Sequence, residues 1–172
     1  MPVDLKSKIR DIPDFPKRGI VFKDIMPLLA DPEALHETVE QLAEFAEPRR
    51  PDYILGAEAR GFILGAALAY RLNCGFVAAR KPGKLPWRTV SAKYALEYGF
   101  DALEVHADAI KSGSRVLIHD DLLATGGTAK AKVDLVEQLG GEVVGLAFVI
   151  ELESLDGREK LDGYDVCSLI KY

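Results

Sequence analysis

The sequence predicts a single α/β domain, in which helices flank a mostly parallel, doubly wound sheet. Short uncharged runs typical of buried strands alternate with runs whose apolar residues recur at helical spacing. The 172 residues suffice to bury one full core. No repeat, low-complexity stretch or composition break divides the chain, so we expect one domain over residues 1–172.

The first half supplies a helix, a strand and a second helix. Asp-Pro-Glu at 31–33 combines a capping residue, a proline in the first turn and an early acid, which together mark a helix start. Apolar residues then recur at helical spacing at Leu35, Val39, Leu42 and Ala46. YILGA at 53–57 predicts a buried strand, and the run 61–72, apolar nearly all round, predicts a buried helix.

The second half continues the alternation. Strands are predicted at 76–80, 115–119, 142–152 and 165–170, and a helix at 128–139 that two glycines close. The stretch 81–99 breaks the rhythm because it holds two prolines, two glycines and several cations. We expect a long loop there, and loops of that length within a compact domain are usually functional or disordered.

Composition narrows the function classes. The balance of 22 basic against 27 acidic residues gives a net charge of −5, which disfavours a general nucleic-acid footprint but leaves room for local anion sites. The two cysteines, Cys74 and Cys167, are too few for a disulfide framework and are expected as reduced thiols. The charged N-terminal stretch lacks a signal-peptide core, and the run 61–70 is far shorter than the ~20 residues that span a bilayer. We expect a cytoplasmic protein with no nucleic-acid or membrane partner.

The segment VLIHDDLLATGGT (116–128) carries the clearest chemistry. A predicted strand ends at two aspartates and a helix begins near Thr128, so the loop lies where open α/β sheets bind ligands. The backbone N–H groups from Ala124 to Thr128 are expected at a helix N-terminus, which favours an anion. Gly126 and Gly127 allow close approach of a ligand, and Thr125 adds a hydroxyl donor as Thr128 does. This loop predicts a phosphate site.

Asp120 and Asp121 predict a different ligand group. Two carboxylates repel a phosphate unless the ligand also brings donors or a cation, and a ribose 5-phosphate offers a pair of hydroxyls. The Walker loop is excluded because Thr128-Ala129 follows the last glycine, and the GxGxxG fingerprint is absent. The alternative is a capped helix that happens to follow an acidic strand end.

The same segment resembles the phosphoribosyl pyrophosphate signature of type I phosphoribosyltransferases. The rest of the chain is similar to the adenine phosphoribosyltransferases within that family. The stretches that carry this likeness are DFPKRGIVFKDI (14–25), GAEARGF (56–62), RKPGKLP (80–86), YALEYG (94–99) and ELESLDGREKL (151–161). The acidic signature alone indicates the superfamily, whereas its combination with RGIVFKDI and YALEYG selects adenine.

The resemblance implies a purine-salvage enzyme that transfers phosphoribosyl to adenine and releases AMP and pyrophosphate. Its transition state resembles an oxocarbenium ion, so catalysis is mainly positioning and electrostatics. Asp120 and Asp121 are implied to accept the ribose hydroxyls, and Glu97 to carry the proton of the purine ring. Mg²⁺ is the implied cofactor, bound through substrate and water rather than directly by the protein.

The resemblance also implies which residues bind pyrophosphate. Arg60, Arg80, Lys81 and Lys84 match the family's pyrophosphate contacts, and some of these cations reach across a homodimer interface. Tyr98 lines the closed site, so 81–99 becomes a mobile basic lid loop that excludes water. A solvated surface loop is the alternative for the lysines. A cis peptide is expected between Glu58 and Ala59, the alternative being a trans peptide.

The N-terminal segment 1–30 is implied to recognise the base. The main-chain carbonyl of Val21 selects the adenine amino group, the Phe22 ring stacks on the base, and Lys23 contacts the nucleotide. Without the resemblance, Val21 and Phe22 are better interpreted as core residues of a short strand. Three departures from the family pattern are found at His119, Lys23 and Met26, the first beside the acid pair and the second at a nucleotide contact.

Three other functions remain open at this stage. The first is a phosphoribosyltransferase for another purine, and the second is a non-catalytic regulator that senses phosphoribosyl pyrophosphate on the same fold. The third is a receiver-like phosphorelay domain, whose acidic pair follows an early strand, whereas the pair at 120–121 comes late in the chain.

Overall fold

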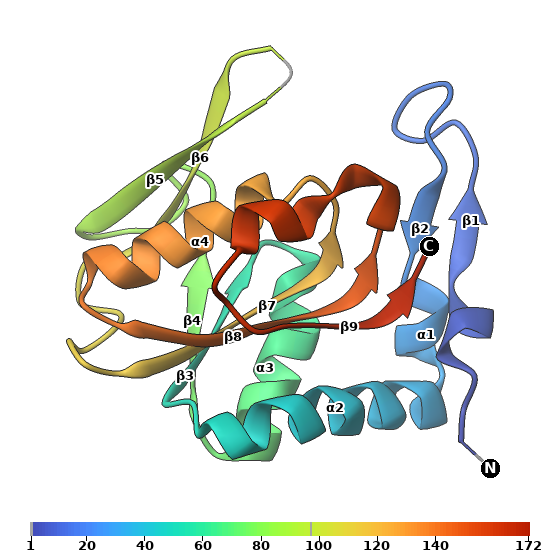
Figure 1. The fold of residues 1–172 in the computed structure, drawn as a ribbon, viewed down its shortest axis with the longest axis horizontal. Helices are drawn as coiled ribbons and strands as arrows, with labels where there is room; N and C mark the ends of the chain where they lie inside the picture. Colours follow the sequence, from blue (N-terminus) through green and yellow to red (C-terminus); the bar gives the residue numbers. More distant parts are fainter. Residues whose placement is uncertain (1, 97) are drawn as a thin grey trace.

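The computed structural model describes residues 2–96 and 98–172. Glu97, the expected proton carrier, lies outside the described residues. Five strands form the central sheet in the order β4-β3-β7-β8-β9, and every neighbouring pair is parallel (Figure 1). Their bounds are β3 Tyr53–Ala57, β4 Gly75–Ala79, β7 Arg115–Leu123, β8 Glu142–Glu151 and β9 Val166–Lys171. The expected parallel α/β architecture is confirmed.

Helices cover both faces of this sheet. Helices α2 (Pro32–Ala46) and α3 (Arg60–Leu72) pack on one face, and α4 (Gly127–Gln138) packs on the other (Figure 1). Strand β7 serves both cores because its side chains alternate: Val116 and Ile118 face α4, whereas Leu117 joins the α2–α3 side. No helix in the described part of the chain is long and apolar enough to cross a membrane.

Two small antiparallel hairpins flank the central sheet. Strands β1 (Arg10–Ile12) and β2 (Phe22–Asp24) form one, beside the short helix α1 (Met26–Ala30). Strands β5 (Thr89–Ala95) and β6 (Phe100–His106) form the other, which packs on α4 and rises above it in Figure 1. Short 3₁₀ turns complete the chain at Leu5–Lys8, Glu47–Arg49, Glu153–Leu155 and Gly157–Leu161.

The structure corrects the expected loop at 81–99. Residues Thr89–Ala95 of that range form strand β5, whose partner β6 begins only at Phe100. Alternation explains the strands, because Ala92 of β5 and Leu103 and Val105 of β6 are buried in the core against α4. The prolines, glycines and cations of the segment masked this period of two.

The strand expected at 115–119 also extends further, to Leu123. Asp120, Leu122 and Leu123 continue the ladder with β8 at Phe148, Ile150 and Glu151. The acid pair therefore lies within the strand, not after it, because the long β8 offers backbone partners beyond the aspartates. Val21 is 50% exposed and is not a core residue, whereas Phe22 begins β2 as the strand interpretation expected.

Candidate active site

A cavity of about 390 Å³ opens at the carboxyl ends of β3 and β7. Its lining comes from the turn 58–60 after β3, from 120–128, and from Lys81, Tyr94, Ala95, Leu96 and Asp101 near the hairpin. The structure thus gathers the acid pair, the expected phosphate loop, Arg60 and Lys81 around one space. It follows the rule that open α/β sheets bind ligands beyond their strand ends.

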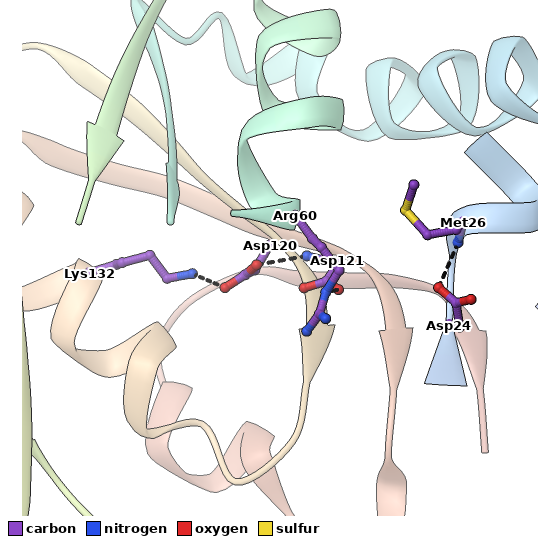
Figure 2. Close-up of polar contacts among 6 residues, drawn as sticks. All are labelled: Asp24, Met26, Arg60, Asp120, Asp121 and Lys132. Atoms are coloured by element: carbon purple, nitrogen blue, oxygen red, sulfur yellow. Dashed lines mark hydrogen bonds and ion pairs between the residues drawn. The ribbon is translucent and has the colours of Figure 1, made fainter. Parts of the chain in front are cut away.

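The acid pair is bonded to two cations (Figure 2). Lys132 Nζ donates to Asp120 Oδ2 at 2.7 Å, and Arg60 Nε donates to Asp121 Oδ2 at 2.6 Å. The Asp121 backbone N–H also donates to Asp120 Oδ1 at 2.9 Å. These four residues, here called the charge cluster, run from α3 across the end of β7 to α4.

The two carboxyls of the charge cluster titrate differently. Burial works to raise the pKa of Asp120, but the charge and hydrogen bond of Lys132 outweigh it and lower that pKa below its usual range. Burial and the neighbouring Asp120 charge raise the pKa of Asp121 to about 6, against the pull of Arg60. Near neutral pH, Asp120 is therefore firmly ionised, and Asp121 is close to its titration range.

The expected phosphate loop has the required shape. Gly126 caps α4 with φ +87°, and α4 begins at Gly127, so the N-terminus of the helix, whose first N–H groups lack intrahelical partners, lies in the cavity lining. A Cβ at Gly126 would lie 2.5 Å from the carbonyl oxygen of Gly157. Lys160 Nζ donates to the carbonyl oxygen of Thr125 at 2.8 Å. The late segment 157–160 thus braces this loop, a role that its sequence did not signal.

The basic residues divide into two groups. Arg60 and Lys81 line the cavity, whereas Arg80 and Lys84 do not, and the Tyr98 side chain is 88% exposed. Glu58 links the turn after β3 to the segment after β4, because its Oε1 accepts from the Lys81 backbone N–H at 2.6 Å. The hydrogen bond to Asp101 raises the pKa of Lys81. The expected cis peptide between Glu58 and Ala59 is confirmed.

The N-terminal segment reaches this site through Arg60. Its guanidinium carbon lies 4.8 Å from the centroid of the Phe22 ring, which also packs edge-on against Phe15. Lys23 bonds to Asp11 at 2.7 Å and lies 4.0 Å from the centroid of the Tyr172 ring. Arg60 therefore contacts both Phe22 and Asp121 of the acid pair. Lys23 instead contacts Asp11 and Tyr172, which do not line the cavity.

Comparison with known proteins identifies this arrangement. The family model of the phosphoribosyl transferase domain matches residues 31–171. An adenine phosphoribosyltransferase of Clostridium perfringens is 61% identical over 170 residues, which cover 99% of both chains. The chain belongs to the adenine phosphoribosyltransferase family.

Solved members of the adenine phosphoribosyltransferase family share the whole fold. The enzyme of Thermoanaerobacter pseudethanolicus superposes with a TM-score of 0.96 at 58% identity, covering 98% of each chain. That of Saccharomyces cerevisiae, complexed with an imino-altritol 1,6-bisphosphate and adenine, gives 0.91 at 42% identity and covers 96% of each chain. The resemblance inferred from the sequence is therefore confirmed at the level of family and fold.

Two of the residues expected to depart from the family pattern, His119 and Met26, have well-defined contacts in the structure. His119 is fully buried, its Nδ1 lies 3.0 Å from the carbonyl oxygen of Ala147, and burial lowers its pKa to about 4. It is therefore neutral near pH 7 and adds no charge beside the acid pair. The Met26 backbone N–H donates to Asp24 Oδ1 at 3.0 Å, while its side chain is half exposed (Figure 2).

Lys132 is the residue of this family member that the sequence reasoning missed. Its side chain is fully buried, yet lysines are almost always exposed unless paired. The buried residues of α4 include Ala129, Lys132, Val133 and Val136, which recur at i, i+3, i+4 and i+7. A lysine inside that apolar stripe was the available signal that a carboxylate partner lay opposite.

Proposed function

We propose that this chain transfers the phosphoribosyl group of phosphoribosyl pyrophosphate to adenine, forming AMP and pyrophosphate in purine salvage. The observation that carries this function is one cavity that joins an acid pair to a helix N-terminal loop and a basic turn. The choice of adenine is supported by the C. perfringens relative and by the S. cerevisiae complex with adenine.

Each part of the cavity suits one part of the sugar substrate. We assign the 5-phosphate to the N–H groups and hydroxyls of 124–128, at the N-terminus of α4, where an anion is favoured. Asp120 and Asp121 accept the ribose hydroxyls, since a carboxylate oxygen that accepts one hydrogen bond still has a second lone pair. Arg60 and Lys81 bind the pyrophosphate, together with Arg80, Lys84 and Tyr98 from the basic segment.

The same residues stabilise the reaction electrostatically. Breaking the bond to pyrophosphate leaves positive charge on the ribose, and the acid pair lies beside the place assigned to that sugar. Adenine is assigned to the Val21 carbonyl and the Phe22 ring, with Lys23 near the nucleotide and Glu97 as proton carrier. The contact between Phe22 and Arg60 supports this placement. It puts the segment assigned to the base next to Arg60, the cation assigned to pyrophosphate.

We propose that Mg²⁺ enters this site bound to the substrate. Both carboxylates of the acid pair already accept from cations, so Mg²⁺ would be held by the substrate and water rather than by protein ligands, as that ion often is. When bound, it supplies neutralisation of the pyrophosphate charge. We further propose a cytoplasmic homodimer, in which cations of the segment 81–99 contribute across the interface and that segment closes over the substrates as a lid.

A panel of bases tests the proposed function. Purified protein with phosphoribosyl pyrophosphate and Mg²⁺ is expected to convert adenine to AMP and to leave hypoxanthine and guanine nearly unchanged. Equal turnover of hypoxanthine or guanine would overturn the adenine assignment. Binding of phosphoribosyl pyrophosphate without turnover of any base would instead support the non-catalytic regulator.

A further inference from the structure

Lys132 is held entirely inside the protein. Its side chain has no exposed surface, and its ammonium lies 2.7 Å from Asp120 Oδ2. A buried ammonium without a counter-charge is strongly unfavourable, and Asp120 is the partner that offsets this burial. The pair links the middle of α4 to the end of β7, where Asp120 lines the cavity.

Asp120 is held on its other side as well. Its Oδ1 accepts from the Asp121 backbone N–H, and a Cβ built on Gly61 would lie only 2.8 Å from the same oxygen. Three elements, α3, β7 and α4, therefore confine this carboxylate. Asp121 differs, because the side chain of its cation, Arg60, is 42% exposed and lines the cavity.

From this asymmetry we propose that Lys132 is a positioning residue that keeps Asp120 charged and fixed, so that Asp121 alone exchanges its cation when substrate binds. The idea rests on the proposed function, since the exchange occurs when pyrophosphate draws Arg60 away. Lys132 has no exposed surface and cannot make that exchange. The acid pair is thus one permanent and one releasable carboxylate.

The surrounding charges give the sign of the effect. The groups that face the pair are Lys132 from α4, Arg60 from α3, and His119 on the same strand, which is neutral because burial lowers its pKa to about 4. Two cations therefore balance two anions. Without Lys132, two adjacent buried carboxylates would have one cation between them and would share a proton near neutral pH.

Carboxyl titration tests this asymmetry without any need for activity. Carbon-13 NMR of the wild-type protein labelled at aspartate carboxyls is expected to show Asp121 titrating near pH 6 while Asp120 stays ionised. Asp120→Asn and Asp121→Asn identify the two resonances. Joint titration of both carboxyls in one pH range would overturn the proposal. A separate titration would support it even if the base panel showed no turnover.

Kinetics of substituted enzymes tests the consequence. Lys132→Met keeps the length of the side chain but removes its charge, and is expected to raise the acid limb of kcat/KM by about 1 to 3 pH units. It should also lower kcat by about 100-fold through misplacement of Asp120, with a smaller change in KM. Lys132→Arg restores the charge and should return the limb towards its wild-type position.

Lys130→Met is the matched control on the same helix. Lys130 pairs with Asp134 at the surface, four residues on, so its loss should leave the pH profile unchanged. An unmoved acid limb in Lys132→Met, or equal shifts in Lys132→Met and Lys132→Arg, would overturn the positioning role. If Lys132→Arg does not fold, the Asp120 resonance in Lys132→Met decides, because its pKa must rise.

Discussion

Gly126→Ala tests the shape of the phosphate loop. The substitution meets two separate penalties in this structure. The backbone at Gly126 has φ +87°, which costs about 1 to 2 kcal/mol for an L-residue. The new Cβ would also lie 2.5 Å from the Gly157 carbonyl oxygen, a backbone atom that moves only with its segment, and such overpacking costs about 1 to 3 kcal/mol.

Together these penalties predict a loss of about 2 to 5 kcal/mol in the free energy of unfolding. For a chain of this length that lowers the Tm by about 4 to 20 °C, measured by calorimetry. A loop displaced from α4 should also bind the 5-phosphate poorly, so kcat/KM for phosphoribosyl pyrophosphate should fall by about 100-fold.

Gly113→Ala separates the two penalties. Gly113 has φ +83°, but no atom lies within 4 Å of a Cβ built there. This control should lose only the backbone penalty of about 1 to 2 kcal/mol and keep its kinetics. Equal losses of stability in the two variants, or full activity in Gly126→Ala, would refute the argument that the Gly157 backbone confines the loop.

Three further predictions concern titratable groups. Asp120→Asn and Asp121→Asn should each lower kcat more than they raise KM, and a change in KM alone would reduce the pair to binding groups. Glu97→Gln should slow adenine turnover and alter its pH profile while substrate binding persists; an unchanged kcat at every pH would contradict proton transfer. His119 has a folded pKa of about 4, so its contribution to stability is complete above pH 6.5 and is lost as pH falls toward 4. Over that range, chemical denaturation should show wild type losing about 3 kcal/mol more than His119→Leu, and parallel curves would show that the histidine is not buried neutral.

Much of the fold was predictable because its strongest signals are local. Apolar runs predicted the five strands of the central sheet, and helical spacing predicted the three long helices. The observed elements differ from the predicted ones only at their ends. The hairpin of β5 and β6 was missed because the prolines and glycines that flank β5 give the segment the composition of a loop, and because its second strand lay beyond the expected loop. The pairing of two strands depends on tertiary structure and cannot be predicted from the sequence of one strand alone.

The candidate site was predictable only where its residues lie close together in the chain. Asp120, Asp121 and the loop 124–128 fall within nine residues, so one stretch of sequence pointed to them together. Lys132 and the brace at 157–160 act across distances in the chain that only folding closes. Their roles follow from contacts, not from residue type, and a lysine taken by itself indicates a surface position.

The brace has a consequence for protein design. A designer who copies residues 116–128 into another parallel sheet would transfer every group that we assign to the 5-phosphate. The copy would lack the Gly157 carbonyl that limits Gly126 and the Lys160 ammonium that holds Thr125. The transferable unit is therefore two segments, 116–128 and 157–160. A graft of the first segment alone should keep the sequence motif but lose the native conformation of its loop.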